Sequence, residues 1–263
     1  MIRFILVAAT VIIFLVLSIP VMVLEWLIGR KNRPLRDRQS LAVVRWIFRI
    51  ILGFAGVKIT VKGRERIPSD RAVLYVGNHR SYFDILVGYT TVPDLMGFVA
   101  KKEMEKIPLL STWMRYVNCL FLDRQNLKEG LKTILAGIDQ VKNGVSVWIF
   151  PEGTRNKEDN PLDLLDFKEG SLKIAEKSGC PVVPVAITGT AEIFEKHFPY
   201  IRPSHVTIEF DSPFMTRELE PEFKKFPGSY AKKRITAMLE EELSAQGKLP
   251  GGISHIQTDK AKE

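Results

Sequence analysis

Residues 72–84, AVLYVGNHRSYFD, start as a short apolar run and continue through a polar loop into a second apolar segment. The first part, Ala72–Val76, has the length and composition of a buried β-strand. The last part opens a longer segment, Phe83–Tyr89, that predicts a helix. A strand that leads directly into a helix is typical of α/β proteins, so this stretch predicts an α/β fold.

The same alternation of short apolar strands and longer helical segments extends on both sides of this stretch. It predicts one mixed β-sheet, largely buried and flanked by helices. Further strands are predicted at Val57–Val61, Gly97–Ala100, Leu120–Leu122, Val145–Phe150, Val182–Ile187 and Val206–Phe210, and further helices at Leu127–Lys142, Gly170–Ser178 and Arg217–Gln246. We therefore expect an α/β domain at residues 57–246, preceded by an N-terminal membrane-associating helical segment (1–56) and followed by a flexible polar tail (247–263).

The composition of the chain excludes several classes of protein. With 263 residues, of which 46% are hydrophobic and 26% charged, the chain is neither disordered nor a protein with many membrane spans. Its two cysteines, Cys119 and Cys180, are too few for a disulfide framework and form no Cys-x-x-Cys pair. This cysteine usage favours a reducing compartment and argues against a zinc module.

The formal net charge of +8 is concentrated in the first quarter of the chain. Residues 1–60 carry 9 Lys and Arg against 2 Asp and Glu, a net charge of +7, which leaves +1 for residues 61–263. Positive charge beside the most apolar stretch indicates an anionic membrane surface as a partner. A nucleic-acid-binding module loses most of its support because the rest of the chain is nearly neutral.

The apolar run from Phe4 to Leu24 contains no charged residue. As one helix it would extend about 31 Å, close to the hydrocarbon thickness of a bilayer. Because basic residues follow the run, the positive-inside rule places the α/β domain, with its active site, on the cytoplasmic side of the membrane. The sequence leaves open whether residues 4–28 span the bilayer or enter one leaflet. A cleaved signal peptide is an alternative, although no small-x-small cleavage site ends the run cleanly.

Leu41–Phe54 predicts a second amphipathic helix, and two placements are open for it. Arg45 and Arg49 lie four residues apart and therefore on one side of the helix. The helix would then lie in the membrane interface with these arginines at the lipid headgroups. Alternatively, it would pack on the α/β domain as an ordinary amphipathic helix.

His79 and Asp84 form the first candidate catalytic pair. On one continuous helix their side chains would point about 140° apart. With His79 in the loop and Asp84 in the first helical turn, the carboxylate can reach the imidazole. It would then fix the tautomer of the ring and leave the other nitrogen free to take a proton from a hydroxyl. The alternative is that Asp84 caps the helix beside a structural histidine.

A second candidate site follows the predicted strand that ends at Phe150. The residues after it are Pro151, Glu152, Gly153, Thr154 and Arg155. Arginine offers a planar fork of donors that suits a phosphate group, and a glycine lets backbone N–H groups approach an anion. Alternatively, residues 152–155 would form an ordinary surface turn held by a salt bridge.

Together the two segments resemble the lysophospholipid (glycerol-phosphate) acyltransferase family, whose members carry the signatures NHxxxxD and FPEGTR. The chain has NHRSYFD at residues 78–84 and FPEGTR at residues 150–155. Other landmarks of the family follow in the expected order: KKEM at 101–104, FLDR at 121–124, FKEG at 167–170 and VPV at 183–185. The resemblance covers roughly residues 57–190 and is strongest to bacterial-type 1-acyl-sn-glycerol-3-phosphate acyltransferases.

The resemblance implies acyl transfer from acyl-CoA or acyl carrier protein to the sn-2 hydroxyl of a lysophospholipid acceptor, 1-acyl-sn-glycerol-3-phosphate. The product would be phosphatidic acid, an intermediate of phospholipid biosynthesis. His79 would be the general base, and Asp84 would orient it. By the same resemblance, the residues that bind the acceptor are Arg124, Glu152, Gly153, Thr154 and Arg155, with Lys101 as a further phosphate contact. No metal or other cofactor is expected.

One position departs from the family pattern. The second motif usually begins with glycine, and this chain has Asn118 there. Asparagine tolerates a positive φ angle better than most residues, so a tight turn would survive the change.

The sequence leaves several other functions open. Another lysophospholipid or an aminolipid could be the acceptor, and the oligomeric state is open. A membrane-bound hydrolase or thioesterase with Ser81 as its nucleophile is a different class of function, but no G-x-S-x-G elbow is present. A non-catalytic lipid-binding protein with the same fold is a further class, which the intact His79 and Asp84 pair disfavours.

Overall fold

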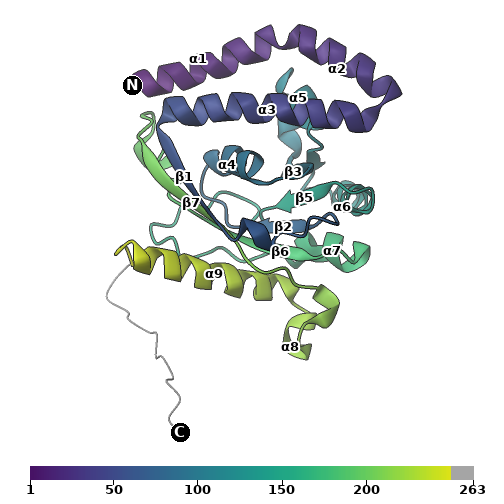
Figure 1. Cartoon of the computed structure of the whole chain (residues 1–263). Helices are drawn as coiled ribbons and strands as arrows, with labels where there is room; N and C mark the ends of the chain where they lie inside the picture. Colours follow the sequence, from purple (N-terminus) through teal and green to yellow (C-terminus); the bar gives the residue numbers. More distant parts are fainter. Residues whose placement is uncertain (250–263) are drawn as a thin grey trace.

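The computed structural model describes residues 1–249, and within them one seven-stranded sheet forms the centre of the molecule (Figure 1). The strand order is β1-β7-β6-β2-β5-β3-β4. The strands are β1 (Val57–Lys62), β2 (Leu74–Gly77), β3 (Met96–Lys101), β4 (Leu120–Leu122), β5 (Ser146–Ile149), β6 (Val182–Thr188) and β7 (Ser204–Phe210). The seven predicted strands are confirmed, with shifts of one or two residues at most ends.

The sheet is mixed, as predicted, because one neighbouring pair is antiparallel. Strands β6 and β7 run in opposite directions, and every other pair of neighbours is parallel. The carboxyl ends of β6, β2, β5, β3 and β4 therefore meet at one edge of the sheet. Open parallel sheets bind their ligands at this edge, where loops from neighbouring strands converge.

Helices cover both faces of the sheet. The α-helices of residues 1–249 are α1 (Ile2–Leu17), α2 (Ile19–Lys31), α3 (Arg33–Ala55), α4 (Phe83–Thr91), α5 (Leu110–Tyr116), α6 (Leu127–Lys142), α7 (Lys173–Ser178), α8 (Pro221–Lys224) and α9 (Pro227–Ala245). The predicted helix Leu127–Lys142 agrees with α6 at both ends. The short helix α5 was not predicted from the sequence.

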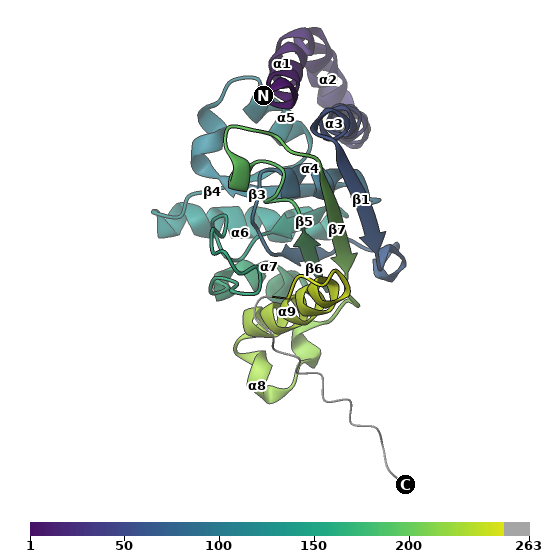
Figure 2. The same ribbon diagram turned by 90° about the vertical axis from the view of Figure 1, so that its left-hand side faces the viewer.

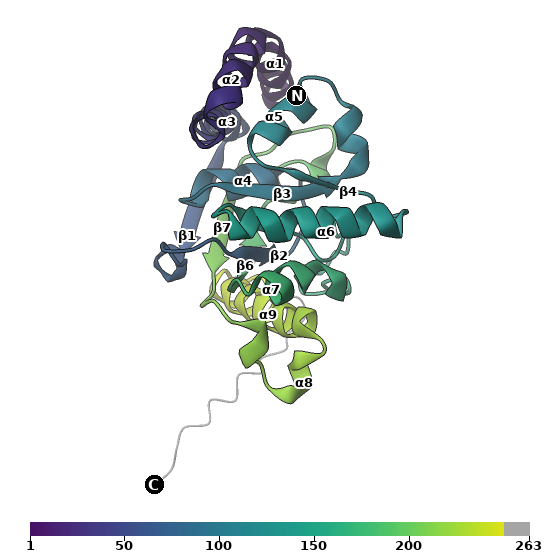
Figure 3. The same ribbon diagram turned by 90° about the vertical axis from the view of Figure 1, so that its right-hand side faces the viewer.

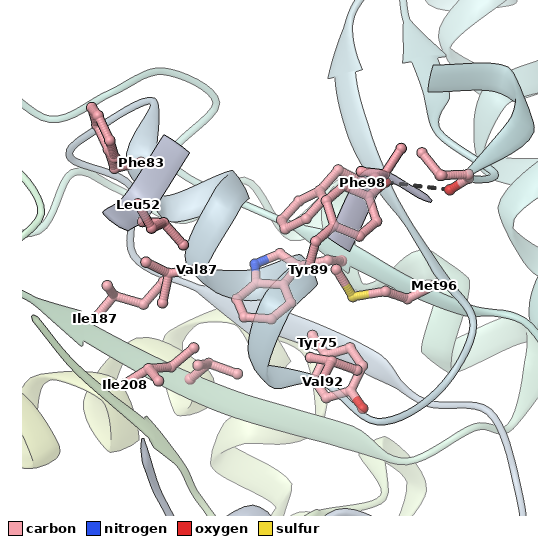
Figure 4. Packing of buried hydrophobic residues seen from close by; sticks show 14 of the residues in the cluster. Leu52, Tyr75, Phe83, Val87, Tyr89, Val92, Met96, Phe98, Ile187 and Ile208 are labelled. Atoms are coloured by element: carbon pink, nitrogen blue, oxygen red, sulfur yellow. Dashed lines mark hydrogen bonds between the residues drawn. The ribbon is translucent and has the colours of Figure 1, made fainter. Parts of the chain in front are cut away.

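Alternating residues of the strands divide the core into two layers. On the face covered by α3 and α4, the buried side chains include Tyr75 of β2, Phe98 of β3 and Trp148 of β5. Figure 4 shows Tyr75 and Phe98 from this layer beside Val87 and Tyr89 of α4. The other face packs on α6, α7 and α9 (Figure 3). A period of two in burial is what a sheet covered on both sides requires.

The N-terminal helices α1 and α2 lie against α3, on the side of α3 away from the sheet (Figures 1 and 2). Within residues 1–249 no single helix is long and apolar enough to span a membrane. Together, α1 and α2 pass the same test of length and composition, but they are bent by 50° at Ser18. Pro20 follows the bend, and its missing N–H is tolerated in the first turn of α2.

Helix α3 includes the predicted amphipathic segment 41–54, and its packing resolves the two placements left open. Leu41, Val44 and Ile47 are buried in the layer between α3 and the sheet. The Arg45 guanidinium donates to the backbone carbonyls of Tyr89 and Val92 at the end of α4, so it joins α3 to the α/β domain. The prediction of a helix packed on the α/β domain is confirmed. One face of α3 therefore packs in the core of the α/β domain.

The C-terminal part differs from the single helix predicted at Arg217–Gln246. Two helices, α8 and α9, replace it, and each begins with a proline, Pro221 and Pro227. The prediction was wrong because proline lacks the N–H that a continuous helix needs and favours the first helical position. Similarly, the predicted helix at Gly170–Ser178 begins with a 3₁₀ turn (Glu169–Leu172) before α7. Of the predicted flexible tail, residues 250–263 lie outside the described part of the chain.

Candidate active site

The two sequence motifs meet where the neighbouring strands β2 and β5 end. Val76 of β2 is in register with Ile149 of β5, and the chain leaves both strands at the same edge of the sheet. We call residues 78–82 the β2 loop and residues 150–156 the β5 loop. Neighbouring strands are about 4.8 Å apart, so side chains from the two loops are within contact distance.

His79 lies in the β2 loop, and Asp84 lies in the first turn of α4, as predicted. The imidazole Nδ1 is 2.8 Å from Asp84 Oδ2. The same carboxylate oxygen accepts the backbone N–H groups of Arg80 and Ser81, each at 2.8 Å. An ionised carboxylate can only accept, so Nδ1 carries the proton and the lone pair of the neutral ring is on Nε2. Asp84 is 1% exposed, which shields these charge-assisted hydrogen bonds from water.

The β5 loop supports the other sides of His79. The imidazole is stacked on the ring of Phe150, with 4.1 Å between centroids and 10° between the ring planes. The backbone N–H of His79 donates to Glu152 Oε1 at 2.8 Å, and its carbonyl accepts the N–H of Asn156 at 2.7 Å. His79 is therefore held through both its backbone and its ring.

Glu152 is a buried link between the two loops and the segment that follows the β5 loop. Its second oxygen, Oε2, accepts the backbone N–H of Leu165 at 3.1 Å, and only 4% of the residue is exposed. Burial raises the pKa of Glu152, although the two backbone N–H donors oppose the shift. The sequence placed Glu152 at the site, and the structure shows it bracing His79.

Asn78, the first residue of the NHRSYFD motif, ties the β2 loop to the strand on the other side. Its amide donates to the carbonyl of Ile187 at 2.9 Å and accepts the N–H of Ile187 at 2.8 Å. The side-chain amide thus makes the same two hydrogen bonds to the backbone of Ile187 that a residue of a neighbouring strand would make. Asn78 is 1% exposed, so this pairing satisfies polar groups that burial would otherwise make costly.

Arg155 is half-buried and is held by two side chains outside its own loop. Its guanidinium carbon lies 3.7 Å from the ring centroid of Tyr82, and Nη2 donates to the Tyr82 hydroxyl at 3.0 Å. Nη1 forms an ion pair with Glu195 at 3.2 Å. The salt bridge that the sequence offered as an alternative explanation of this turn is therefore present. Arginine remains charged, so the group is still able to bind an anion.

The other predicted binding residues are placed at the same edge at different depths. Gly153 is buried with φ of 75°, a backbone conformation that favours glycine, and a β-carbon there would lie 3.0 Å from Lys168 Nζ. Thr154 is exposed beside it. Lys101 at the end of β3 and Arg124 after β4 are exposed at the same edge, one and two strands beyond β5.

Asn118, which replaces the usual glycine of the second motif, has φ of 60°. The prediction that asparagine would preserve the tight turn is confirmed. Its carbonyl lies against Gly97 of β3, where an added β-carbon would be only 1.7 Å from the Asn118 oxygen. The turn therefore needs a residue that accepts positive φ at 118 and glycine at 97.

Sequence reasoning missed three contributors to the site: Tyr82, Phe150 as the stacking partner of His79, and Glu195. Tyr82 and Phe150 lie inside the quoted motifs, but no spacing rule predicts which side chains stack. Glu195 lies in a short 3₁₀ helix outside the motifs. Ser81, the nucleophile of the alternative hydrolase, is 0% exposed and donates its hydroxyl hydrogen to Glu195. A buried, hydrogen-bonded hydroxyl does not suit a nucleophile.

Comparison with known proteins agrees with this geometry. The family model of the acyltransferases matches residues 58–188. The probable 1-acyl-sn-glycerol-3-phosphate acyltransferase of Mycoplasma pneumoniae is 31% identical over 188 residues, which cover 67% of this chain and 69% of that protein. The chain belongs to the acyltransferase family. The family resemblance inferred from the two signatures is confirmed.

Two further members of the acyltransferase family are similar to the chain. The 1-acyl-sn-glycerol-3-phosphate acyltransferase of Borreliella burgdorferi is 32% identical over 160 residues, 61% of this chain and 63% of that protein, so the match spans less than two thirds of its length. The crystal structure of the 1-acyl-sn-glycerophosphate (LPA) acyltransferase PlsC from Thermotoga maritima aligns with a TM-score of 0.77 at 27% identity. This alignment covers 92% of this chain and 95% of that structure.

Proposed function

We propose that the protein transfers a fatty acyl group from a thioester to the sn-2 hydroxyl of 1-acyl-sn-glycerol-3-phosphate, giving phosphatidic acid. The observation that carries the proposal is the His79–Asp84 pair, with Nδ1 bound to a buried carboxylate and Nε2 as the basic nitrogen. The names of the relatives support the same acceptor. Acyl-CoA and acyl carrier protein are both proposed as sources of the thioester.

His79 acts as general base and then as general acid in this reaction. Nε2 takes the proton of the acceptor hydroxyl as its oxygen attacks the thioester carbonyl, and the imidazolium that forms is stabilised by Asp84. When the C–S bond breaks, the same proton passes to the departing thiolate, so the histidine returns to its neutral form. A general base at this position contributes about 10²–10⁴ in rate.

The cationic groups at the same edge are proposed to bind the phosphate of the acceptor. Arg155 is adjacent to the His79 loop and offers a planar donor fork, which matches a phosphate geometrically. Lys101 and Arg124 add positive charge one and two strands further along the edge. Gly153 and Thr154 form the tight turn that presents Arg155, while Glu152 fixes the neighbouring His79 backbone.

The proposed location is the membrane, with the active site on the cytoplasmic side. Helices α1 and α2 expose a large set of apolar side chains: Ile2, Ile5, Leu6, Val11, Ile12, Ile13, Val16, Leu17, Ile19, Val23, Leu24, Trp26 and Leu27. An apolar surface of this extent marks an interaction site. The basic residues that follow in the sequence suit an anionic lipid surface.

Sedimentation with anionic vesicles tests this location. We expect the double variant Ile12→Glu, Leu17→Glu to bind vesicles at least tenfold more weakly, since burying each apolar side chain contributes about 1.5–3 kcal/mol. The matched control is Leu131→Glu, which changes an exposed leucine on α6, away from the N-terminal helices. Unchanged sedimentation of the double variant would contradict the proposal that α1 and α2 bind the membrane.

The reaction is tested by incubating the purified full-length protein with a panel of lysophospholipid acceptors and both donor types. Mass spectrometry of the products distinguishes the possible functions. Diacyl product from 1-acyl-sn-glycerol-3-phosphate supports the proposal. Free fatty acid without diacyl product would indicate a hydrolase. Preference for another acceptor would show that the protein is an acyltransferase for a different lysophospholipid or for an aminolipid.

A further inference from the structure

Glu195 lies in a short 3₁₀ helix, η4 (Glu195–His197), in the segment that joins β6 to β7. Although it is outside both sequence motifs, its carboxylate contacts both loops of the site. Oε2 accepts the Ser81 hydroxyl at 2.6 Å, while Oε1 accepts the Tyr82 N–H at 2.8 Å and the Arg155 guanidinium at 3.2 Å. One side chain from a third segment thus joins the β2 loop to the β5 loop.

The contact with Ser81 also reaches the start of α4. The Ser81 hydroxyl accepts the backbone N–H of Phe83 at 3.0 Å, and Phe83 is the first residue of that helix. Asp84, the partner of His79, is the next residue. The Ser81 hydroxyl therefore connects the Glu195 carboxylate to the first turn of α4, and this turn carries Asp84. Because Ser81 is completely buried, water does not compete for these hydrogen bonds.

The contact with Arg155 limits where that side chain can point. Glu195 holds one edge of the guanidinium, and Tyr82 contacts both its face and its other edge. A long, flexible side chain that is already held by its neighbours loses less freedom when it binds a ligand. Without Glu195, only the contacts with Tyr82 would remain.

Glu195 itself is held from several directions. The preceding residue, Phe194, stacks on Phe4 of α1 with 5.9 Å between centroids and 13° between ring planes. The N–H of Lys196 donates to the carbonyl of Ala191 at 3.1 Å and closes the turn. Nearby, Glu192 pairs with the Lys196 ammonium at 2.6 Å and is half exposed. Glu192 is thus a second carboxylate of the same segment, and it pairs with Lys196 instead of with the two loops of the site.

We propose that Glu195 is a positioning residue of the acceptor site. Its carboxylate fixes the Arg155 guanidinium against Tyr82 and the start of α4 against the β2 loop, which sets the distance between the phosphate-binding group and His79. The inference rests on the proposed acyl transfer, and it assigns to Glu195 a role that acts through Arg155 and Ser81 rather than by contact with the reacting atoms.

The test compares Glu195→Ala and Glu195→Gln in the full-length protein, each with Arg155 intact and with Arg155→Ala. We expect Glu195→Ala to raise the KM for 1-acyl-sn-glycerol-3-phosphate about tenfold and to leave the KM for the thioester donor unchanged. Glu195→Gln should recover most of this loss, because its amide oxygen still accepts the Tyr82 and Arg155 donors. In the Arg155→Ala background, neither substitution should raise the acceptor KM further.

The control is Glu192→Gln, which removes a charge from the same segment and should leave both KM values unchanged. Melting temperatures of all variants show whether each one folds. If Glu195→Ala does not fold, Glu195→Gln is the deciding variant. It should raise the acceptor KM about two- to threefold with Arg155 intact and not at all in the Arg155→Ala background. Equal effects in both backgrounds, or an unchanged acceptor KM, would overturn the inference alone. A wild-type protein without acyl transfer would instead contradict the proposed function and, with it, this inference.

Discussion

The β2 loop and the β5 loop lie side by side at the same sheet edge, but they hold their principal side chains in different ways. His79 is fixed by a carboxylate five residues away, by a stacked ring and by two backbone hydrogen bonds. Within residues 1–249, the Arg155 guanidinium is held by two side chains, that of Tyr82 and that of Glu195, which is 40 residues further along the chain. The group proposed for proton transfer is therefore held mainly by contacts close in sequence, and the group proposed for recognition depends on a contact from a distant segment.

This difference matches what each group has to do. Proton transfer requires a base within hydrogen-bond distance of one hydroxyl, and small displacements are costly in rate. A phosphate group presents several equivalent oxygens, so a guanidinium can bind it in more than one arrangement.

Replacing His79 with alanine should produce the largest effect. We expect kcat to fall about 10³-fold, since the base that accepts the hydroxyl proton is lost. The Asp84 carboxylate keeps its backbone donors, so the variant should remain folded. Steady-state rates and a melting curve measure both effects. The control is His205→Ala, which changes an exposed histidine that contacts Thr60. If His79→Ala transferred acyl groups near the wild-type rate, the proposed role of His79 would be refuted.

Asp84→Asn should lower kcat by about 10²-fold with little change in either KM. An amide oxygen can still orient the imidazole, but it lacks the negative charge that stabilises the imidazolium. The backbone N–H groups of Arg80 and Ser81 also lose a charged acceptor, which should cost about 1–2 kcal/mol of stability. Rates at saturating substrate and denaturant unfolding measure the two effects. A change in KM alone would show that Asp84 acts in binding.

The sequence predicted the part of the site held by local contacts better than the part held by long-range contacts. His79 and Asp84 belong to one strand–loop–helix unit, so the predicted ends of the strand and the helix already put the carboxylate within reach of the imidazole, and the family resemblance favoured this pair over a helix cap. Hydrophobic periodicity predicted the seven strands. Glu195 approaches Arg155 only because β6 lies next to β2, and its contact with Ser81 spans 114 residues. A long-range contact of this kind depends on strand order, which local patterns do not determine.

Arg155→Ala should raise the KM for the phosphate-bearing acceptor about tenfold or more, because a charge-assisted hydrogen bond contributes about 1.5–3 kcal/mol. The KM for the donor should be unchanged. An acceptor without phosphate, 1-acylglycerol, provides the internal control, since its rate should be the same with both proteins. If the variant loses activity equally on both acceptors, Arg155 shapes the loop and does not bind phosphate.

Glu152 should give the smallest effect, visible as a pH dependence of stability. Burial raises the pKa of Glu152 above its ordinary value of 4.5, which means that the folded protein holds the proton more tightly than the unfolded chain does. The stability contributed by this proton is complete below pH 4.5 and is lost as the pH rises through the raised pKa.

Glu152→Gln removes this titration while it keeps one acceptor for the N–H of His79 or Leu165. The free energy of unfolding of the wild type relative to the variant should therefore decrease as the pH rises from 4.5 to neutral, measured by urea unfolding at several pH values. Glu222→Gln, which changes an exposed carboxylate on α8, is the control. A difference that grows with pH would show that the hydrogen bonds from His79 and Leu165 outweigh burial and lower the pKa of Glu152.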